Sequence, residues 1–123
     1  MKLHKKNPDI NFIHSSFEGF NPKGEQFDVV CTGGLLTHMN PKAVPSIIDK
    51  MVMLSKSHIF GFDNYADKLT EVNYRGNLNQ LFKQNYPKLF RDRYPSLETK
   101  MEIKYPYINE DLTDIVYLLK KPE

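Results

Sequence analysis

The chain has 123 residues, a net charge of +2, 40% hydrophobic residues and 26% charged residues, which suits one ordinary globular domain. The charge gives no reason to expect a nucleic-acid partner, and no apolar run approaches the length of a membrane span. Cys31 has no second cysteine to pair with, and the basic N-terminus lacks the apolar region of a secretory signal, so the sequence favours a cytoplasmic protein.

The first quarter of the chain shows few signs of regular structure. Residues 1–9 form a polar segment that ends in a turn signal, and we expect a single domain over residues 10–123. Residues 10–14 alternate weakly between apolar and polar side chains, which predicts a short strand. Residues 15–26 hold turn-forming glycines and a proline with little periodicity, which predicts a loop.

Residues 27–63 read as a strand, a helix and a second strand. The apolar run 27–32 predicts a strand that is buried on both faces, as in a parallel sheet. Asn40-Pro41 is a helix-start signal, and apolar residues follow it at spacings of three and four as far as Leu54. The run 58–62 predicts the next strand. A crossover of this length joins parallel strands and is right-handed.

The rest of the chain predicts a loop, a helix and a hairpin. Residues 64–84 lack a clear period, and long loops in compact domains are usually functional. Asn85 is the expected cap of a second helix, which Pro95 ends. Residues 97–105 alternate with period two and residues 113–119 are nearly all apolar, so these consecutive strands should pair antiparallel. The predicted fold class is therefore α/β.

This sequence resembles class I S-adenosylmethionine-dependent methyltransferases. Residues 27–41, with Phe-Asp-Val-Val and then Gly, Leu, His and Pro, resemble the fourth strand of that sheet and the loop after it. Residues 58–65, followed by Tyr-Arg-Gly at 74–76 and Leu-Phe-Lys at 81–83, are similar to the methylases associated with pseudaminic acid biosynthesis. The resemblance runs from about residue 10 to residue 121. It implies a Rossmann-like sheet of parallel strands that ends in an antiparallel hairpin.

The resemblance covers only the C-terminal half of such a domain. A methyltransferase of this class begins with a strand and a glycine-rich turn that hold the cofactor, and a second strand then ends in an acidic ligand of the ribose. None of the six glycines here forms that motif. The expected fold is therefore a truncated methyltransferase sheet that lacks the first two strands and the glycine-rich loop.

The absent strands have a physical consequence for strand 27–32. In the usual sheet order the missing first strand lies between the third and the fourth, so the edge of strand 27–32 is left unpaired. An exposed apolar edge recruits another strand. We therefore expect either that strand 10–14 moves in beside it or that two chains pair there. A homo-oligomer, or a partner chain that supplies the missing half, follows from this prediction.

The resemblance implies two groups of contacts to S-adenosylmethionine. The loop after the third strand would touch the adenine through Ser15, Ser16 and Phe17. The end of the fourth strand supplies Thr32, Gly33 and Gly34. The carboxyl ends of parallel strands are where such sheets bind ligands, and paired glycines let a ligand approach the backbone. For both groups the alternative is an ordinary turn after a strand.

His38 and Asp63 are the candidate catalytic residues. His38 precedes the expected helix, and its imidazole could act as a base near neutral pH, although a histidine here more often packs against the fold in the family. Asp63 ends the second parallel strand, where the family has a glutamate. The four histidines show no metal-ligand spacing, so no metal site is expected. Cys31, in a buried strand, should behave as a small apolar residue.

The candidate substrate contacts follow the second parallel strand. They are Asn64, Tyr65, Tyr74 and Arg75. The planar fork of an arginine suits a carboxylate or a phosphate, groups that sugar acids and nucleotide sugars carry. A surface ion pair of Arg75 with Glu71 or Asp67 is the alternative.

Three functions remain open on the sequence alone. The first is a methyltransferase that acts on a sugar or another small molecule, with its cofactor site completed elsewhere. The second is a catalytically inactive remnant that serves as a binding or oligomerisation module. The third is a small sugar- or nucleotide-binding protein that uses the Arg75 loop alone. Binding of S-adenosylmethionine would separate the first from the others.

Overall fold

The computed structural model describes residues 9–108 and 111–123, so most of the polar segment 1–9 lies outside the described residues. The elements follow one another in the order β1 Phe27–Gly33, η2 Leu36–His38, α1 Val44–Leu54, β2 Ser55–Asn64, β3 Thr70–Tyr74, β4 Asn77–Lys83, α2 Tyr86–Arg93, β5 Glu98–Pro106 and β6 Thr113–Lys120, where η2 is a 3-10 helix. Within these residues no helix is both long and apolar enough to cross a bilayer.

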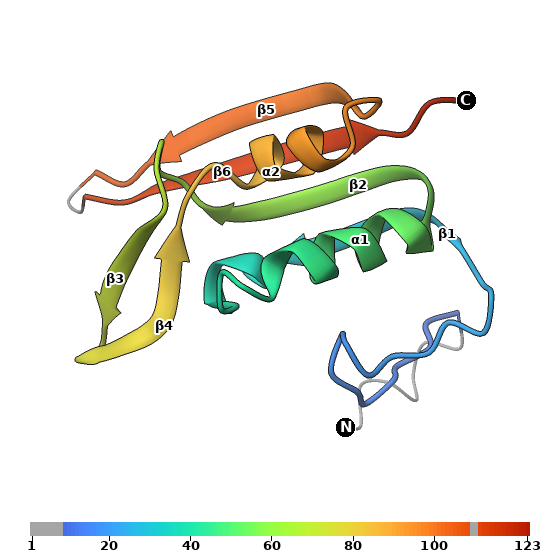
Figure 1. Ribbon diagram of the computed structural model, residues 1–123, viewed down its shortest axis with the longest axis horizontal. Coiled ribbons are helices and arrows are strands. Elements are labelled where there is room, and N and C mark those ends of the chain that lie inside the picture. The colour runs from blue at the N-terminus through green and yellow to red at the C-terminus, as the bar shows by residue number, and fades with distance from the viewer. Residues whose placement is uncertain (1–8, 109–110) are drawn as a thin grey trace.

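Four strands form the main sheet in the order β1-β2-β6-β5 (Figure 1). β1 and β2 run parallel, with Val30 opposite Ile59, and α1 is the crossover between them. β6 pairs antiparallel with both β2 and β5. The predicted α/β sheet, with parallel strands followed by an antiparallel hairpin, is confirmed.

Both α-helices lie on one face of this sheet, and the core is between the layers (Figure 1). The apolar residues of α1 recur at the predicted spacing, because one side of an amphipathic helix must face the sheet. The fully buried side chains on this side include Ile47, Ile48 and Met51 of α1, Phe90 of α2, and Ile59, Ile115 and Tyr117 of the sheet.

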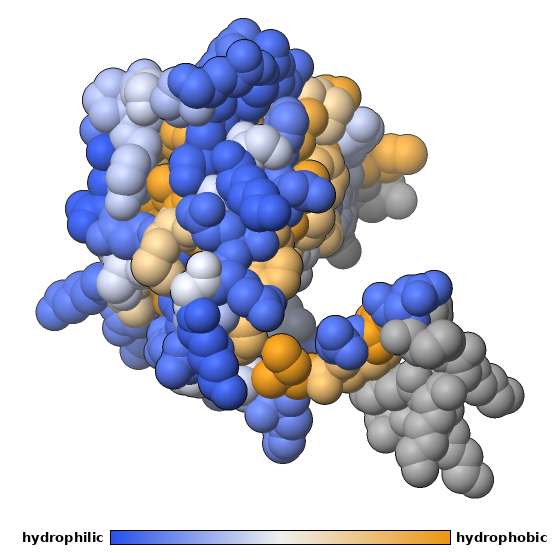
Figure 2. Space-filling model, turned by 90° about the vertical axis from the view of Figure 1, so that its right-hand side faces the viewer, coloured by the Kyte–Doolittle hydropathy of each residue, from blue (hydrophilic) through white to orange (hydrophobic). Residues whose placement is uncertain are grey.

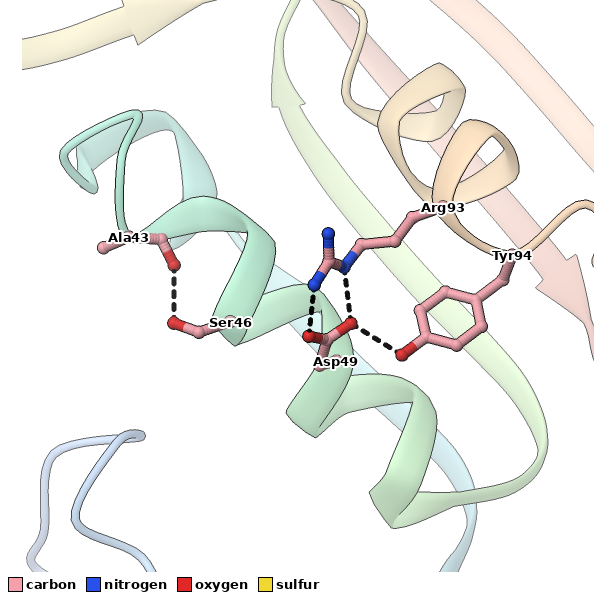
Figure 3. Close-up of polar contacts among 5 residues, drawn as sticks. All are labelled: Ala43, Ser46, Asp49, Arg93 and Tyr94. Carbon is pink, nitrogen blue, oxygen red and sulfur yellow. Dashed lines mark hydrogen bonds and ion pairs between the residues drawn. The ribbon is translucent and has the colours of Figure 1, made fainter.

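A carboxylate on α1 ties the two helices together (Figure 3). Asp49 accepts hydrogen bonds from Nε and Nη2 of Arg93 at 2.6 and 2.7 Å, and from the hydroxyl of Tyr94 at 2.6 Å. A bidentate pair of this kind fixes orientation as well as distance. On the same helix, the Ser46 hydroxyl donates to the Ala43 carbonyl at 2.9 Å. The Asp49 contacts therefore set where the end of α2 sits on α1.

The second face of the sheet carries apolar side chains without a helix over them. In β1, Val30 is buried, whereas Val29 is 44% exposed and Cys31 is exposed. Cys31 lies opposite Phe60 across the sheet, next to the half-exposed Phe62 of the same strand. Apolar residues also form a band on the right-hand part of the main body in Figure 2. The prediction that β1 is buried on both faces, Cys31 included, is wrong, because helices cover only one side.

The strand predicted for residues 10–14 is wrong. These residues form no strand, and Phe12 and Ile13 are 54% and 64% exposed. β1 is the edge strand of the four-stranded sheet, so the expected rearrangement of segment 10–14 beside it does not occur. A run of five residues with weak alternation has too little apolar surface to offset the entropy lost on ordering it.

The predicted loop over residues 64–84 contains an antiparallel hairpin, β3–β4. Tyr74 pairs with Asn77 across a two-residue turn, in which Arg75 and Gly76 have φ values of 53° and 80°. Positive φ at both central positions is the mark of a type I′ hairpin turn. The Tyr-Arg-Gly motif therefore has a backbone role at the hairpin tip, which its composition alone does not reveal.

α1 begins at Val44, later than the Asn40-Pro41 signal predicts. The Asn40 side chain accepts the Lys42 N–H at 2.9 Å, and its carbonyl accepts the Ala43 N–H at 2.8 Å. These bonds close a turn before the helix starts, so the prediction of a helix start at Asn40 is wrong.

α2 begins where the sequence predicts. The Asn85 side chain accepts the backbone N–H of Lys88 at 3.2 Å, which is the expected N-cap bond. The helix ends at Arg93, before Pro95. The predicted cap and end are confirmed, because both depend on local contacts only.

Candidate functional site

A cavity of about 390 Å³ opens where β1 and β2 end and the β3–β4 hairpin begins. We call it the strand-end pocket. Six of the predicted site residues line it: Gly34, His38, Asp63, Asn64, Tyr74 and Arg75. The carboxyl ends of parallel strands are where open α/β sheets bind ligands. The structure thus brings together residues that lie as far apart as 34 and 75 in the sequence.

The glycine pair shapes the mouth of this pocket. Gly34 has a φ of 72°, a conformation that favours glycine, and its N–H donates to the Phe62 carbonyl at 2.8 Å. A Cβ added to Gly33 would lie 3.2 Å from the Phe62 ring. The chain therefore turns sharply off β1 over the end of β2, which leaves room for the pocket.

Asp63 lies at the base of the pocket, and the side chain is 1% exposed. Oδ1 accepts hydrogen bonds from the N–H and the hydroxyl of Thr37, both at 3.1 Å, and Oδ2 accepts from the hydroxyl of Tyr117 at 2.9 Å. The Thr37 hydroxyl also accepts the Asn64 N–H at 2.9 Å. Both carboxylate oxygens are thus occupied by protein donors.

Burial changes the acid strength of the groups in this network. Desolvation raises the pKa of Asp63 from 3.8 to about 6, and the hydrogen bonds from Tyr117 and Thr37 only partly oppose it. Burial and the neighbouring Asp63 hold the pKa of Tyr117 well above its usual value. Burial also raises the pKa of Tyr86 to about 12. Of these three groups, Asp63 is the one whose pKa lies closest to neutral pH.

His38 joins η2 to the hairpin. Nδ1 lies 2.7 Å from the carbonyl oxygen of Gln80, and the ring packs edge-on against Tyr74 with 5.5 Å between the centroids. A carbonyl can only accept, so Nδ1 of the neutral ring carries the proton and Nε2 keeps its lone pair. The geometry gives the pocket a histidine whose free nitrogen is the basic one.

Arg75 stands at the hairpin tip and lines the pocket. Its guanidinium lies over the Tyr74 ring, 5.0 Å from the centroid. The Glu71 carboxylate contacts a different partner, because its Oε2 accepts the backbone N–H of Asn79 at 2.6 Å. Another wall carries Asp114, which accepts a hydrogen bond from the Tyr107 hydroxyl at 2.8 Å. The pocket therefore presents a cationic group and an anionic group.

Ser15, Ser16 and Phe17 are not among the residues that line the pocket. They belong to a turn that Lys50 of α1 holds: Nζ donates to the carbonyls of Phe17 and Phe20 at 2.6 and 2.5 Å. In Figure 1 this turn, in blue, lies away from the hairpin and below α1. Phe17 packs against the hydrophobic core instead.

Three further predicted contacts also lie outside the pocket lining. Thr32 and Gly33 are on β1 itself, and the Thr32 hydroxyl is buried with no hydrogen-bond partner in the described part of the chain. Tyr65 packs against the core, and Lys104 lies over its ring at 4.2 Å from the centroid. These three residues thus belong to the sheet and the core rather than to the cavity.

Sequence reasoning missed Thr37 and Tyr117, the residues that hold Asp63. Tyr117 is fully buried in β6, and a Cβ added to Gly61 would lie 2.3 Å from its ring. A glycine inside an apolar strand often marks the close approach of another group, so Gly61 was the available signal. Nothing in the sequence pointed to Thr37.

The fold is shared with solved S-adenosylmethionine-dependent methyltransferases. The 1,6-didemethyltoxoflavin-N1-methyltransferase of Burkholderia thailandensis, solved with 1,6-didemethyltoxoflavin and S-adenosylhomocysteine, matches 99% of this chain with a TM-score of 0.78 and 15% identity. The N-methyltransferase NodS of Bradyrhizobium japonicum WM9 matches 99% with a TM-score of 0.73 and 14% identity. A putative methyltransferase from Listeria monocytogenes matches 99% with a TM-score of 0.71 and 12% identity.

At these identities the likeness establishes the fold: the chain has the class I methyltransferase-like fold that the resemblance implied. The chain spans 56% of the length of the Burkholderia protein and 65% of NodS. No protein-family model matches the sequence, and a comparison with curated sequences found no significant match. The narrower resemblance to pseudaminic acid-associated methylases stays a prediction.

Proposed function

We propose that this chain is the acceptor-binding part of an S-adenosylmethionine-dependent methyltransferase that acts on a small molecule. The strand-end pocket is the observation that carries the proposal. It places His38, Tyr74 and Arg75 at the carboxyl ends of two parallel strands, in a fold that methyltransferases share. Bound S-adenosylmethionine would supply the methyl group.

The described residues fit the cofactor only in part. Gly34 lines the pocket, and a Cβ added there would meet no atom within 4 Å, so the backbone is accessible at this turn. The other predicted cofactor contacts are on the sheet or on the α1 side of the molecule. We therefore assign the cofactor's main contacts to another part of the polypeptide or to a second chain.

The pocket residues suit the work of binding and deprotonating an acceptor. Nε2 of His38 is free to take the proton that an amine or hydroxyl loses when it becomes methylated. Arg75 can bind a carboxylate or phosphate, and stacking on Tyr74 limits the directions its fork can take. A sugar acid or a nucleotide sugar is the acceptor class that these groups favour.

The uncovered sheet face supports a second proposal, an oligomer. β1 is an edge strand with exposed Phe27 and Val29, and exposed apolar edges and faces promote association. A second copy that pairs along β1 would satisfy the strand edge, and a partner polypeptide that completes the cofactor half would cover the sheet face. An inactive assembly module would use the same surface without the pocket. We place the protein in the cytoplasm, because Cys31 has no cysteine to pair with.

Calorimetry tests the function directly. The purified protein is titrated with S-adenosylmethionine, S-adenosylhomocysteine and UDP-glucuronate, a probe with both a carboxylate and a diphosphate. We expect micromolar binding of UDP-glucuronate that Arg75→Ala weakens at least tenfold, while Arg91→Ala, on the far helix, leaves it unchanged. Absence of all binding at millimolar ligand, in a folded protein, would leave only the assembly module.

A further inference from the structure

We propose that Thr37 and Asp63 are positioning residues that hold His38 in the place and tautomer that the strand-end pocket needs. This inference rests on the proposed function, in which His38 Nε2 is the group that meets the acceptor. Asp63 is covered by protein donors on both oxygens. Asp63 therefore acts through Thr37, its neighbour on η2, and not on the acceptor itself.

η2 depends on Asp63 for its position. It is only three residues long, and the residue before it, Leu35, provides no side-chain cap. The Thr37 N–H is one of the donors that a helix start leaves without a backbone partner, and Oδ1 of Asp63 accepts it. The buried end of β2 thus supplies the capping acceptor that the turn lacks.

The Thr37 hydroxyl adds further hydrogen bonds between η2 and the end of β2. It donates to Asp63 Oδ1 and accepts the Asn64 N–H, so one hydroxyl connects two successive residues of β2. Thr37 is 2% exposed, and water is therefore not available to replace either bond. Any loosening of Thr37 moves the next residue, His38.

His38 completes a continuous path from the sheet to the hairpin. Tyr117 of β6 donates to Asp63, Asp63 accepts from Thr37, and His38 Nδ1 donates to Gln80 of β4. The Nδ1–H tautomer lasts only while η2 keeps His38 within reach of that carbonyl. This chain of hydrogen bonds therefore determines which imidazole nitrogen is left unprotonated to meet the acceptor.

Ring NMR of His38 is the test. Long-range ¹H–¹⁵N spectra distinguish the Nδ1–H from the Nε2–H tautomer, and a purely structural role of Thr37 would not alter that signature in a folded protein. We expect wild type to show mainly Nδ1–H, and Thr37→Val, which removes the hydroxyl at constant shape, to show a mixture. Thr37→Ser, which restores the hydroxyl, should return the wild-type signature.

Thr32→Val is the matched control, because the Thr32 hydroxyl is buried on β1 without a partner in the described part of the chain. It should leave the His38 signals unchanged. A folded Thr37→Val protein with wild-type His38 signals overturns the inference, and so does an equal change in Thr32→Val. If Thr37→Val does not fold, Asp63→Asn decides: neutral hydrogen bonds replace charge-assisted ones, so a smaller change of the same kind is expected and no change refutes the proposal.

The ring signature is independent of ligand binding. If the tautomer changes as expected but no acceptor or cofactor binds by calorimetry, the positioning role stands and the proposed function fails. If ligands bind to wild type and to Thr37→Val with equal affinity and equal His38 signals, the function stands and the positioning role fails.

Discussion

The Tyr117 hydroxyl donates a hydrogen bond to the Asp63 carboxylate across 2.9 Å inside the sheet, with both residues almost completely buried. This bond joins the parallel half of the sheet to the antiparallel half, because Asp63 ends β2 and Tyr117 is in the middle of β6. A Cβ on Gly61 would overlap the tyrosine ring, so the bond also requires a glycine in β2. Site and core are thus one packed unit.

Gly61→Ala should destabilise the protein. The added methyl group would lie 2.3 Å from the Tyr117 ring, which cannot move because it is fully buried. Overpacking of this kind costs about 1–3 kcal/mol of unfolding free energy, and the loss of the Asp63 bond adds to it. Urea unfolding measures the change.

Gly33→Ala is the control for that substitution. Its Cβ would meet the Phe62 ring at 3.2 Å, but that side chain is 42% exposed and can turn away. We expect a clearly smaller loss of stability. Equal losses for the two variants would contradict the packing argument for Gly61.

Stability should fall as the pH rises through the titration of Asp63. Its folded pKa of about 6 is above the ordinary 3.8, so the folded state binds this proton more tightly than the unfolded state. The stabilisation that Asp63 gives the folded state is complete below about pH 4. It is lost as the pH rises through 6, which lowers the free energy of unfolding by about 3 kcal/mol. The difference in unfolding free energy between wild type and Asp63→Asn, measured from pH 4 to pH 7, isolates the effect of Asp63. A difference that does not vary with pH would show that Asp63 does not titrate there.

The Asp49–Arg93 pair should have the opposite pH dependence. The Arg93 and Tyr94 hydrogen bonds lower the pKa of Asp49 to about 2, so its contribution is present above about pH 4 and is lost as the pH falls towards 2. Both side chains are partly exposed, so Asp49→Asn should cost at most about 1 kcal/mol. Asp92→Asn, which breaks a more exposed pair with Lys88, serves as the comparison and should cost less.

The uncovered sheet face should control the oligomeric state of the protein, and therefore its mass in solution. Val29 is 44% exposed on that face, so Val29→Lys adds a charge there without disturbing the core. We expect wild type to associate at micromolar concentration and Val29→Lys to weaken the association at least tenfold. Light scattering against concentration measures it. Leu78→Lys, at a 61% exposed position of the hairpin, should leave the mass unchanged.

The elements that the sequence predicted well are those held by local contacts. Asn85 caps α2 with its own side chain, and strands β5 and β6 follow one another with clear apolar periodicity. The β3–β4 hairpin was not predicted from the sequence, because its side chains are mostly exposed and its turn is Arg75-Gly76 rather than the usual Asn-Gly or Asp-Gly. Residues 10–14 show the reverse error, a weak alternation that predicted a strand where none forms.

The candidate site was predicted in its residue types but not in its geometry. His38, Asp63 and Arg75 were identified because ligands gather at strand ends and because these side chains carry suitable chemistry. The roles proposed for them rest on contacts across long sequence distances, such as Thr37 with Asp63 and His38 with Gln80. No local pattern encodes such contacts.

The order of apolar and polar side chains along this chain was sufficient to determine a parallel pair followed by an antiparallel hairpin, because strand and helix periods are local properties of the backbone. Only the folded arrangement decided that one face of the sheet stays uncovered and that Asp63 is sealed under η2 while Arg75 stays at the surface. Burial depends on which distant segments pack together, and it is burial that distinguishes the Asp63 carboxylate, held by protein donors, from the Arg75 guanidinium at the pocket surface.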